Sequence, residues 1–263
     1  MEAHISDLKA IAASPNEDFD SILGAYDRAG SLLSKVASVY GNYTSSLNTP
    51  DMQAVQTQMA PVLSRHNSKA YDIPGLFEKI EKLYNVKDEK VTSGEWTAEQ
   101  SRLAERVYIK FVRMGANFDA ATKGEYTDIQ AELASLQCKF MQNVLKDEED
   151  WELVIKSEDM EGCPPDLIAA ARQAAIDRNH GEVDHVLTLS RSMVEPFLSY
   201  SKRRDLRKTV FEAFSKRGEL NADRDNKKIA VDMLRLRKRQ ASLHNKKVST
   251  LFILLVVSIQ THI

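Results

Sequence analysis

The chain has 263 residues, of which 43% are hydrophobic and 28% are charged, with only ten glycines and seven prolines. This composition excludes collagen-like, low-complexity and wholly disordered chains, and the length predicts one large domain or two modest ones. The formal net charge is −2, but residues 200–247 carry 16 Lys and Arg against 6 Asp and Glu, whereas the rest of the chain carries 20 against 32.

Helical periodicity dominates the first 150 residues. The segment Ser14–Glu17 has the form of a capping box with proline at the first helical position. Apolar side chains behind it recur at steps of three and four residues, which predicts one amphipathic helix of about seven turns that reaches Tyr40. Thr49-Pro50 predicts the start of a second helix that runs toward His66, and Pro74–Tyr84 predicts a third.

Two further capping signatures occur in this region. Thr97–Gln100 and Thr122–Glu125 each predict the start of another long helix. The apolar stripes of these two helices comprise Leu103, Val107, Phe111 and Met114 in the first, and Ile129, Leu133, Leu136, Phe140 and Val144 in the second.

The pattern changes after residue 150. Trp151–Ile155 and His185–Leu189 are short runs rich in β-branched residues, which predict two strands of a small sheet. Pro164-Pro165 predicts the start of an intervening helix that continues through Arg178. Because that helix separates the strands, they do not form a tight hairpin.

The rest of the chain predicts two helices and a tail. The first helix carries an apolar stripe and ends at Gly218 in the C-terminal cap position, and the second spans Asn226–Leu243. The apolar run Leu251–Ile259 is about half the length of a membrane-spanning helix, so we expect no membrane partner. The stripe of the first helix comprises Leu206, Val210, Phe211 and Phe214.

These changes divide the chain into three predicted segments. They are a helical N-terminal region over residues 1–150, a mixed region of two short strands plus helices over residues 151–244, and an atypical apolar tail over residues 245–263. The predicted fold class is mainly α, with long antiparallel helices and a small two-stranded β element.

The two cysteines, Cys138 and Cys163, are too few for a disulfide framework or a structural zinc site. Cys138 lies on a predicted helix and is interpreted as a small buried side chain, whereas Cys163 precedes Pro164 in a loop where exposure is expected. The start of the chain has no basic region followed by an apolar one, unlike a secretory signal. We therefore expect a reduced, cytoplasmic protein.

The histidines argue against a catalytic metal site. None is followed by glutamate, so the H-E-x-x-H motif does not occur, and no two lie four residues apart on one helical face. His180 and His185 are five residues apart, but Gly181 indicates a loop between them. No nucleophile elbow or phosphate-binding loop occurs either. We predict no catalytic, cofactor-binding or metal-binding residue, and interpret as ordinary surface or strand histidines His4, His66, His180, His185, His244 and His262.

Charge runs raise two further possibilities. The acidic run Asp147–Asp150 could bind a cation, but a calcium loop needs spaced oxygen ligands and a turn glycine, so we interpret the run as a solvated helix end. The basic segments Lys202–Arg204 and Arg235–Arg239 suggest nucleic-acid binding. Interleaved acidic residues and the lack of an aromatic platform favour solvated helix faces, so we expect no nucleic-acid partner. Binding through residues 200–247 stays an alternative.

Four long segments carry a family resemblance: Ser101–Phe118, Ile129–Leu145, Leu187–Gly218 and Asn226–Leu243. Together they resemble the N-terminal half of the thimet-oligopeptidase-like zinc metallopeptidases. The closest branch is peptidyl-dipeptidase (dipeptidyl carboxypeptidase), and oligopeptidase A is a relative. The resemblance runs from roughly Ser14 to Leu243 and stops at His244, so we expect truncation before the catalytic motif.

The resemblance implies the N-terminal part of a larger channel-forming peptidase fold, in which helices wall one side of a channel that admits short unstructured peptides. In a complete member, zinc would activate water and the glutamate of the H-E-x-x-H motif would act as general base. We expect a fragment that is inactive alone and binds no zinc specifically, with short peptides as substrates of the complete protein. The alternative is a non-enzymatic helical module that binds peptides or proteins. The oligomeric state is not predicted.

Overall fold

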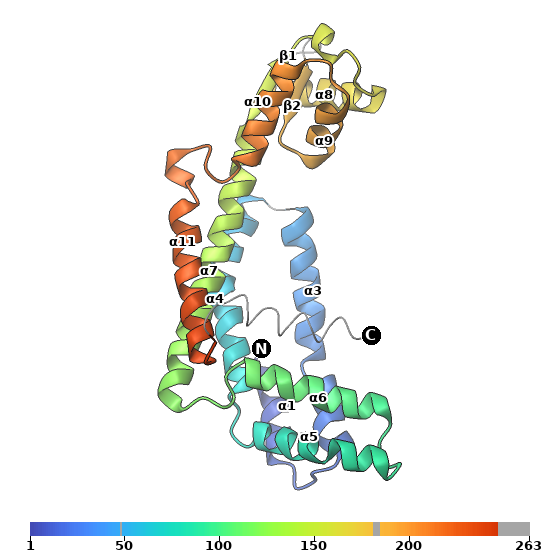
Figure 1. The fold of residues 1–263 in the computed structure, drawn as a ribbon, viewed down its shortest axis with the longest axis vertical. Helices are drawn as coiled ribbons and strands as arrows, with labels where there is room; N and C mark the ends of the chain where they lie inside the picture. Colours follow the sequence, from blue (N-terminus) through green and yellow to red (C-terminus); the bar gives the residue numbers. More distant parts are fainter. Residues whose placement is uncertain (48, 181–184, 247–263) are drawn as a thin grey trace. The chain divides into compact units, whose positions relative to one another are not determined.

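The computed structural model describes residues 1–47, 49–180 and 185–246 (Figure 1). Among the described residues, unit 1 comprises Met1–Cys138 together with Met233–Lys246, and unit 2 comprises Lys139–Asp232. The predicted fold class is confirmed, because helices dominate and two strands form a small antiparallel sheet. In chain order the elements are α1 (Glu2–Ala13), η1 (Asp20–Gly24), α2 (Ala25–Arg28), α3 (Ser31–Ser46), α4 (Pro50–Tyr71), α5 (Leu76–Thr92), α6 (Ala98–Arg113), α7 (Ala120–Asp150), β1 (Glu152–Ile155), η2 (Ser157–Met160), α8 (Pro165–Asp177), β2 (His185–Thr188), α9 (Arg191–Tyr200), α10 (Arg204–Ser215), η3 (Ala222–Arg224) and α11 (Lys227–Leu243).

Aromatic side chains form the centre of the unit 1 core. Phe111 on α6 is fully buried, and its ring centroid lies 5.6 Å from that of Tyr26, 4.9 Å from that of Tyr71 and 6.1 Å from that of Phe77. Helices α5 and α6 lie side by side, and their apolar stripes meet in this core (Figure 1). The other buried members of the core are Ile5, Leu8, Ile11, Ile22, Leu23, Ala70, Ile73, Leu76, Ile80, Leu83, Trp96, Ala104 and Val107.

Local capping sets the start of two helices in unit 1. The hydroxyl of Thr97 accepts a hydrogen bond from the backbone N–H of Gln100 at 3.2 Å, and Oε1 of Gln100 accepts one from the N–H of Thr97 at 2.8 Å. This reciprocal pair confirms the predicted capping box of α6. The hydroxyl of Thr49 accepts from the N–H of Met52 at 3.3 Å and caps α4, as predicted.

The first predicted helix differs from the structure. Ser14 follows the end of α1, and the carboxylate of Asp18 instead caps the next turn by accepting from the N–H of Ser21 at 2.9 Å. The chain is then interrupted at Gly30, whose φ of +72° is left-handed and whose Cβ would lie 2.7 Å from Cδ2 of His4. A left-handed residue cannot continue a right-handed helix, so the predicted seven-turn helix is wrong and α3 begins anew after Gly30.

Other boundaries of the predicted helices shift. The second and third helices continue past His66 and Tyr84, because no glycine or proline lies between His66 and the end of α4 at Tyr71, or between Tyr84 and the end of α5 at Thr92. The capping box predicted at Thr122 is wrong, since the carboxylate of Asp119 accepts from the N–H of Thr122 at 2.8 Å and α7 starts just after Asp119. Helix α1 was not predicted, although Ile5, Leu8 and Ile11 recur at a three-residue step.

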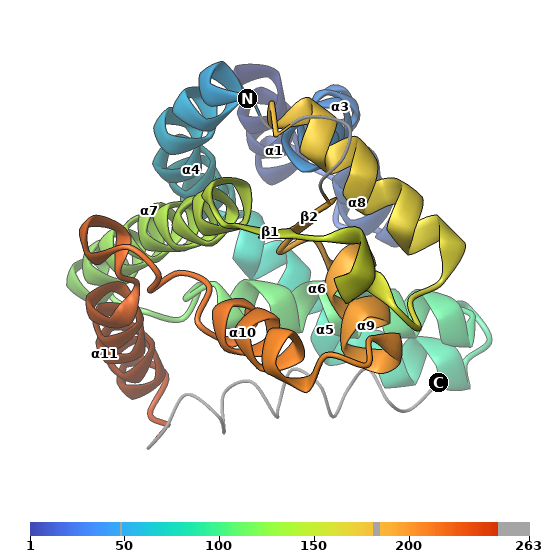
Figure 2. The ribbon, with the colours of Figure 1, turned by 90° about the horizontal axis from the view of Figure 1, so that it is seen from above.

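Unit 2 contains the predicted sheet. Strands β1 and β2 pair antiparallel, with Glu152 opposite Thr188 and Ile155 opposite His185, which confirms both strands. Helix α8 confirms the intervening helix and packs along β2, while α9 contacts both β2 and α8 (Figure 2). Helix α10 corresponds to the predicted helix before Gly218. Helix α9 was not predicted, and Pro196 in its interior is a signal against a helix.

The two units divide the chain at different points from the three predicted segments. Most of α11 belongs with the first 138 residues, and α7 ends in unit 2. Compactness does not test whether a segment folds by itself. The segments 1–150, 151–244 and 245–263 therefore stay a prediction of domain organisation.

The apolar run Leu251–Ile259 lies outside the described residues. Within the three described ranges, no helix combines the length and the apolar character that crossing a membrane requires.

Candidate functional site

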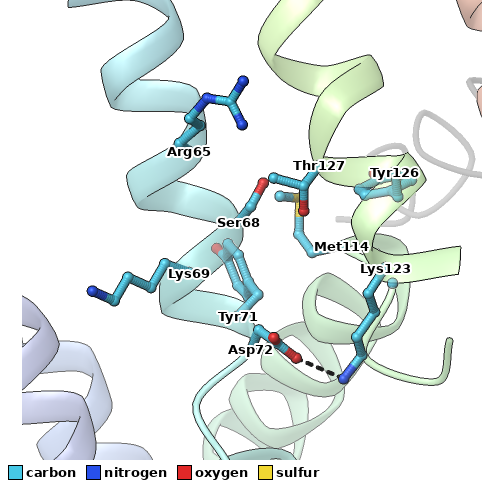
Figure 3. A pocket seen from close by; sticks show the side chains of 10 residues that line it. Arg65, Ser68, Lys69, Tyr71, Asp72, Met114, Lys123, Tyr126 and Thr127 are labelled. Carbon is cyan, nitrogen blue, oxygen red and sulfur yellow. Dashed lines mark hydrogen bonds and ion pairs between the residues drawn. The ribbon is translucent and has the colours of Figure 1, made fainter. Parts of the chain in front are cut away.

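A pocket of about 220 Å³ in unit 1 lies beside α4, the segment that follows α6, and the first turns of α7 (Figure 3). Asp72, just after α4, forms an ion pair with Lys123 of α7, with 2.7 Å between Oδ1 and Nζ. Arg65 pairs at 3.2 Å with Asp128, which lies outside the lining. The ammonium of Lys69 points away from the other labelled polar groups (Figure 3). The lining residues are Arg65, Ser68, Lys69, Tyr71, Asp72, Met114, Gly115, Lys123, Tyr126 and Thr127.

The pocket offers polar contacts but no nucleophile with a base. The hydroxyl oxygen of Ser68 is buried and has no hydrogen-bond partner among the described residues. The lining contains no histidine, and Asp72 is engaged by Lys123, so nothing in the lining activates Ser68. This arrangement can bind a small polar group. No sequence motif marks this pocket, because residues such as Ser68 and Lys123 come from distant segments of the chain.

A pair of histidines joins α1 to α4. Nδ1 of His4 lies 3.0 Å from Nε2 of His66, and His66 is 7% exposed. One nitrogen must donate and the other accept, so the hydrogen bond requires at least one neutral ring. Burial is the main cause that lowers the pKa of both histidines, and the positively charged N-terminal amino group lowers both pKa values further. The negative charge of Asp7 raises the pKa of His4 and partly opposes this effect. Two histidines 62 residues apart carry no sequence signal for this pairing.

We expect unit 1 to lose stability as the pH falls below about 6.5, the ordinary pKa of histidine. Because the folded pKa values of His4 and His66 are lowered, the unfolded chain binds protons more readily, and the free energy of unfolding decreases on acidification. The fluorescence of Trp96 should show a lower melting temperature at about pH 5.5 than at about pH 7.5.

Replacing both histidines by glutamine should reduce this pH dependence. A part will remain, because burial also lowers the pKa of His244 in the same unit. An unchanged pH dependence in the double variant would show that the pair does not act as described.

The other described histidines do not form a metal pair. Nε2 of His180 lies 2.7 Å from Oε1 of Glu152, which also pairs with Arg178 at 3.1 Å. His185 is fully buried on β2, and His244 packs against the ring of Phe118 at 4.7 Å. The prediction that the histidines are ordinary surface or strand residues fits His185, which lies on β2. It is wrong for His66, which is buried on helix α4. His262 lies outside the described residues.

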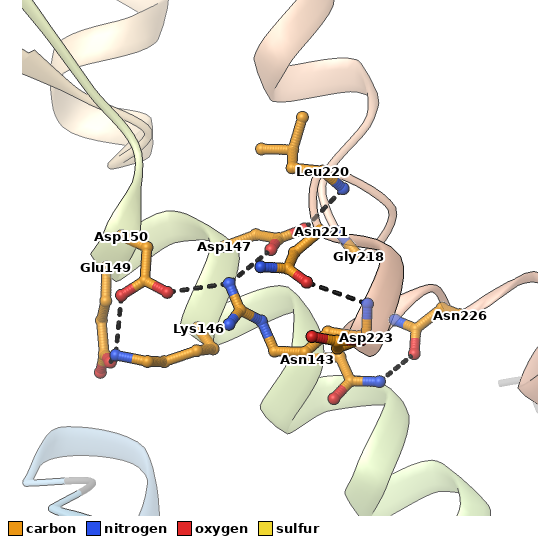
Figure 4. A network of polar contacts seen from close by, with 11 residues as sticks. Asn143, Lys146, Asp147, Glu149, Asp150, Gly218, Leu220, Asn221, Asp223 and Asn226 are labelled. Carbon is orange, nitrogen blue, oxygen red and sulfur yellow. Dashed lines mark hydrogen bonds and ion pairs between the residues drawn. The ribbon is translucent and has the colours of Figure 1, made fainter.

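The acidic run at the end of α7 holds a loop in place (Figure 4). Asp147 is 1% exposed, and its Oδ2 accepts from the N–H groups of Gly218 at 2.8 Å and Leu220 at 3.0 Å. Arg224 bridges Asp147 at 3.3 Å and Asp150 at 2.8 Å. Interpretation of the whole run as a solvated helix end is therefore wrong for Asp147. The carboxylate of Asp147 accepts hydrogen bonds from two backbone N–H groups and forms an ion pair with the guanidinium of Arg224.

Both cysteines are shielded. Cys138 is half-buried, and Cys163 is 9% exposed within the unit 2 core beside Met160 and Leu167, so the exposure expected for Cys163 is wrong. Burial raises the pKa of both thiols, which disfavours the reactive thiolate form.

Each basic segment carries a guanidinium paired with a carboxylate. Arg203 contacts Asp205 at 2.7 Å, and this hydrogen bond lowers the pKa of Asp205 to about 2. Nη2 of Arg239 lies 2.8 Å from Oε2 of Glu125. These pairs are typical of mixed-charge helix faces. The absence of a nucleic-acid partner stays a prediction.

The donor set does not fit a hydrolytic zinc ion. Such an ion needs three protein ligands and an open position for water. Among residues 1–47, 49–180 and 185–246, no three His, Cys, Asp or Glu side chains converge as a metal site. We therefore derive no reaction step through a metal on this chain.

The helical fold alone does not identify the class of this protein, but similarity to proteins of known sequence does. No protein-family model matches the chain. The chain is nevertheless a homologue of peptidases of the thimet-oligopeptidase family, which confirms the resemblance carried by its helical segments.

Three relatives define this similarity. The chain is 26% identical over 247 residues to dipeptidyl carboxypeptidase of Escherichia coli (strain K12), covering 92% of this chain and 35% of that protein. It is 25% identical over 253 residues to the probable cytosolic oligopeptidase A of Arabidopsis thaliana, covering 92% and 34%. It is 29% identical over 170 residues to the organellar oligopeptidase A of the same plant, covering 61% and 21%. The chain thus spans about a third or less of the length of the curated relatives it matches.

Proposed function

We propose that this chain supplies a helical, non-catalytic portion of a peptidase of the oligopeptidase A or dipeptidyl carboxypeptidase type. The observation that carries the proposal is the similarity over 92% of the chain to about a third of the E. coli enzyme. The complete protein would act on short peptides, with zinc held by residues outside this chain. A cytoplasmic location is part of the proposal and is supported by the cytosolic relative.

The proposal assigns no hydrolysis to this chain by itself. None of its six histidines is followed by glutamate, so the zinc-binding helix motif is missing from the sequence. The buried carboxylate of Asp147 accepts hydrogen bonds from backbone N–H groups and pairs with Arg224, so it is not free to act in catalysis.

A hydrolysis assay tests the proposal. The purified chain, incubated with zinc and a short quenched-fluorescent peptide, should release no product, whereas dipeptidyl carboxypeptidase of E. coli serves as the active control. Cleavage that a chelator abolishes, and that co-purifies with the chain through gel filtration, would contradict the proposal.

A further inference from the structure

A second pocket in unit 1, of about 500 Å³, is lined by residues of α1 and α4 together with Met1. Helix α1 contributes Ile5 and Lys9, and helix α4 contributes Arg65, His66 and Lys69. Residues three or four apart lie on the same side of a helix. Each helix therefore turns one face toward the pocket.

Cationic side chains outnumber anionic ones around this pocket. Lys9, Arg65 and Lys69 line it together with a single carboxylate, that of Glu2. Neither lysine forms an ion pair with a described residue. The ammonium of Lys69 also points away from the polar groups of the pocket beside Ser68 (Figure 3). Both ammonium groups are therefore free to bind an anion.

The guanidinium of Arg65 keeps donors for a ligand as well. Only its Nη1 contacts Asp128, and the two side chains are 59% and 75% exposed. Ion pairs with this much exposure contribute little to stability, so a ligand can compete for Arg65 at small cost. Three positive side chains and one negative side chain give the lining a net charge of +2.

His66 adds a buried polar group to the same pocket. Its Nε2 lies 3.0 Å from Nδ1 of His4, whereas its Nδ1 has no hydrogen-bond partner among the described residues. When His4 donates to Nε2, the proton of a neutral His66 lies on Nδ1, and this nitrogen can donate to an anion. Burial lowers the pKa of His66, and the positive charge of Lys69 lowers it further. The field in the pocket is therefore positive.

We propose that this pocket binds the phosphate group of a small phosphate monoester. Such a group carries a charge of about −1.5 to −2 at neutral pH, which matches the net charge of the lining. Its three terminal oxygens accept from the ammonium groups of Lys9 and Lys69 and from the guanidinium of Arg65. A carboxylate has two oxygens and one negative charge, so it uses fewer of these donors. The proposal does not depend on the peptidase proposal.

The apolar part of the lining accounts for the organic group of the ester. Ile5 is 7% exposed, and the side chains of Met1 and Val62 are 39% and 45% exposed. Inorganic phosphate leaves these side chains in water, whereas a short alkyl ester covers part of them. Since each buried methylene contributes roughly a four-fold gain in affinity, n-butyl phosphate should bind about ten-fold more tightly than inorganic phosphate.

Isothermal titration calorimetry of the intact chain tests the proposal, with inorganic phosphate, n-butyl phosphate and butyrate as the three ligands. Both phosphates should saturate a single site, and the double variant Lys9→Gln, Lys69→Gln should weaken their binding about ten-fold or more. Lys35→Gln is the matched control, because it removes an exposed positive charge of the same unit outside the pocket. Its affinity should change less than about two-fold. Circular dichroism should show unchanged helix content, because all three lysines are exposed.

Three calorimetric results would overturn the proposal. They are no saturable binding of either phosphate, an equal loss of affinity in Lys35→Gln, which would indicate an adventitious ion only, and binding of butyrate as tight as that of n-butyl phosphate. Long-range ¹H–¹⁵N spectra test the part of His66. In the chain saturated with n-butyl phosphate its proton should lie on Nδ1, and a proton on Nε2 alone would contradict donation by His66.

Discussion

Replacing Asp147 by alanine is expected to lower the free energy of unfolding of unit 2 by about 3–5 kcal/mol. The carboxylate is 1% exposed, and its loss leaves the N–H groups of Gly218 and Leu220 without their acceptor. It also removes one partner of the Arg224 guanidinium at the same point. The expected loss of stability therefore has two sources: two backbone N–H groups lose their acceptor, and the guanidinium of Arg224 loses one of its two carboxylate partners.

Urea unfolding monitored through Trp151 measures this effect, since that tryptophan packs against the unit 2 core. Trp96 is replaced by phenylalanine in both proteins so that only unit 2 is reported. Glu149→Ala is the matched control on the same run, because Glu149 is exposed and its variant should differ by less than about 0.5 kcal/mol. Equal losses in the two variants would show that burial of Asp147 is not the cause.

Replacing Phe111 by alanine is expected to lower the free energy of unfolding of unit 1 by about 3–5 kcal/mol. Its ring is fully buried among Tyr26, Tyr71 and Phe77, so truncation removes apolar contacts and leaves a cavity that rigid aromatic neighbours cannot fill. Tyr43→Ala is the control in the same unit, because the Tyr43 ring is 51% exposed.

The fluorescence of Trp96, a buried member of the same core, follows unfolding of unit 1 in a protein with Trp151 replaced by phenylalanine. The control should shift the unfolding midpoint little. A Phe111 variant as stable as the control would contradict the packing described for this core.

The sequence predicted those elements whose signals are local. The capping box of Thr97 and Gln100 was predicted correctly, because both partners lie within one turn and need no other segment. The break at Gly30 was not predicted, because glycine is tolerated in helices, and its left-handed conformation is supported here by close contact with His4 from another helix. Whether a glycine such as Gly30 ends a helix therefore depends on contacts with segments that are distant in the sequence.

The candidate sites could be predicted even less well than the helices, because their residues come from segments that are distant in the sequence. Asp147 looked like one of four solvated carboxylates, and its burial depends on a loop 71 residues further along the chain. The His4–His66 pair and the pocket at Ser68 are likewise assembled from distant segments. The family resemblance, in contrast, could be read from the sequence, because long segments such as Leu187–Gly218 carry it.

Zinc stoichiometry shows whether this peptidase homologue has a catalytic metal centre of its own, which we predict it lacks. The intact chain is loaded with zinc, dialysed against zinc-free buffer, and analysed for bound metal beside dipeptidyl carboxypeptidase of E. coli. We expect this chain to retain no zinc, because a hydrolytic site requires three convergent protein ligands. Retention of one zinc ion per chain, with three of its own side chains as ligands in the X-ray absorption spectrum, would contradict it.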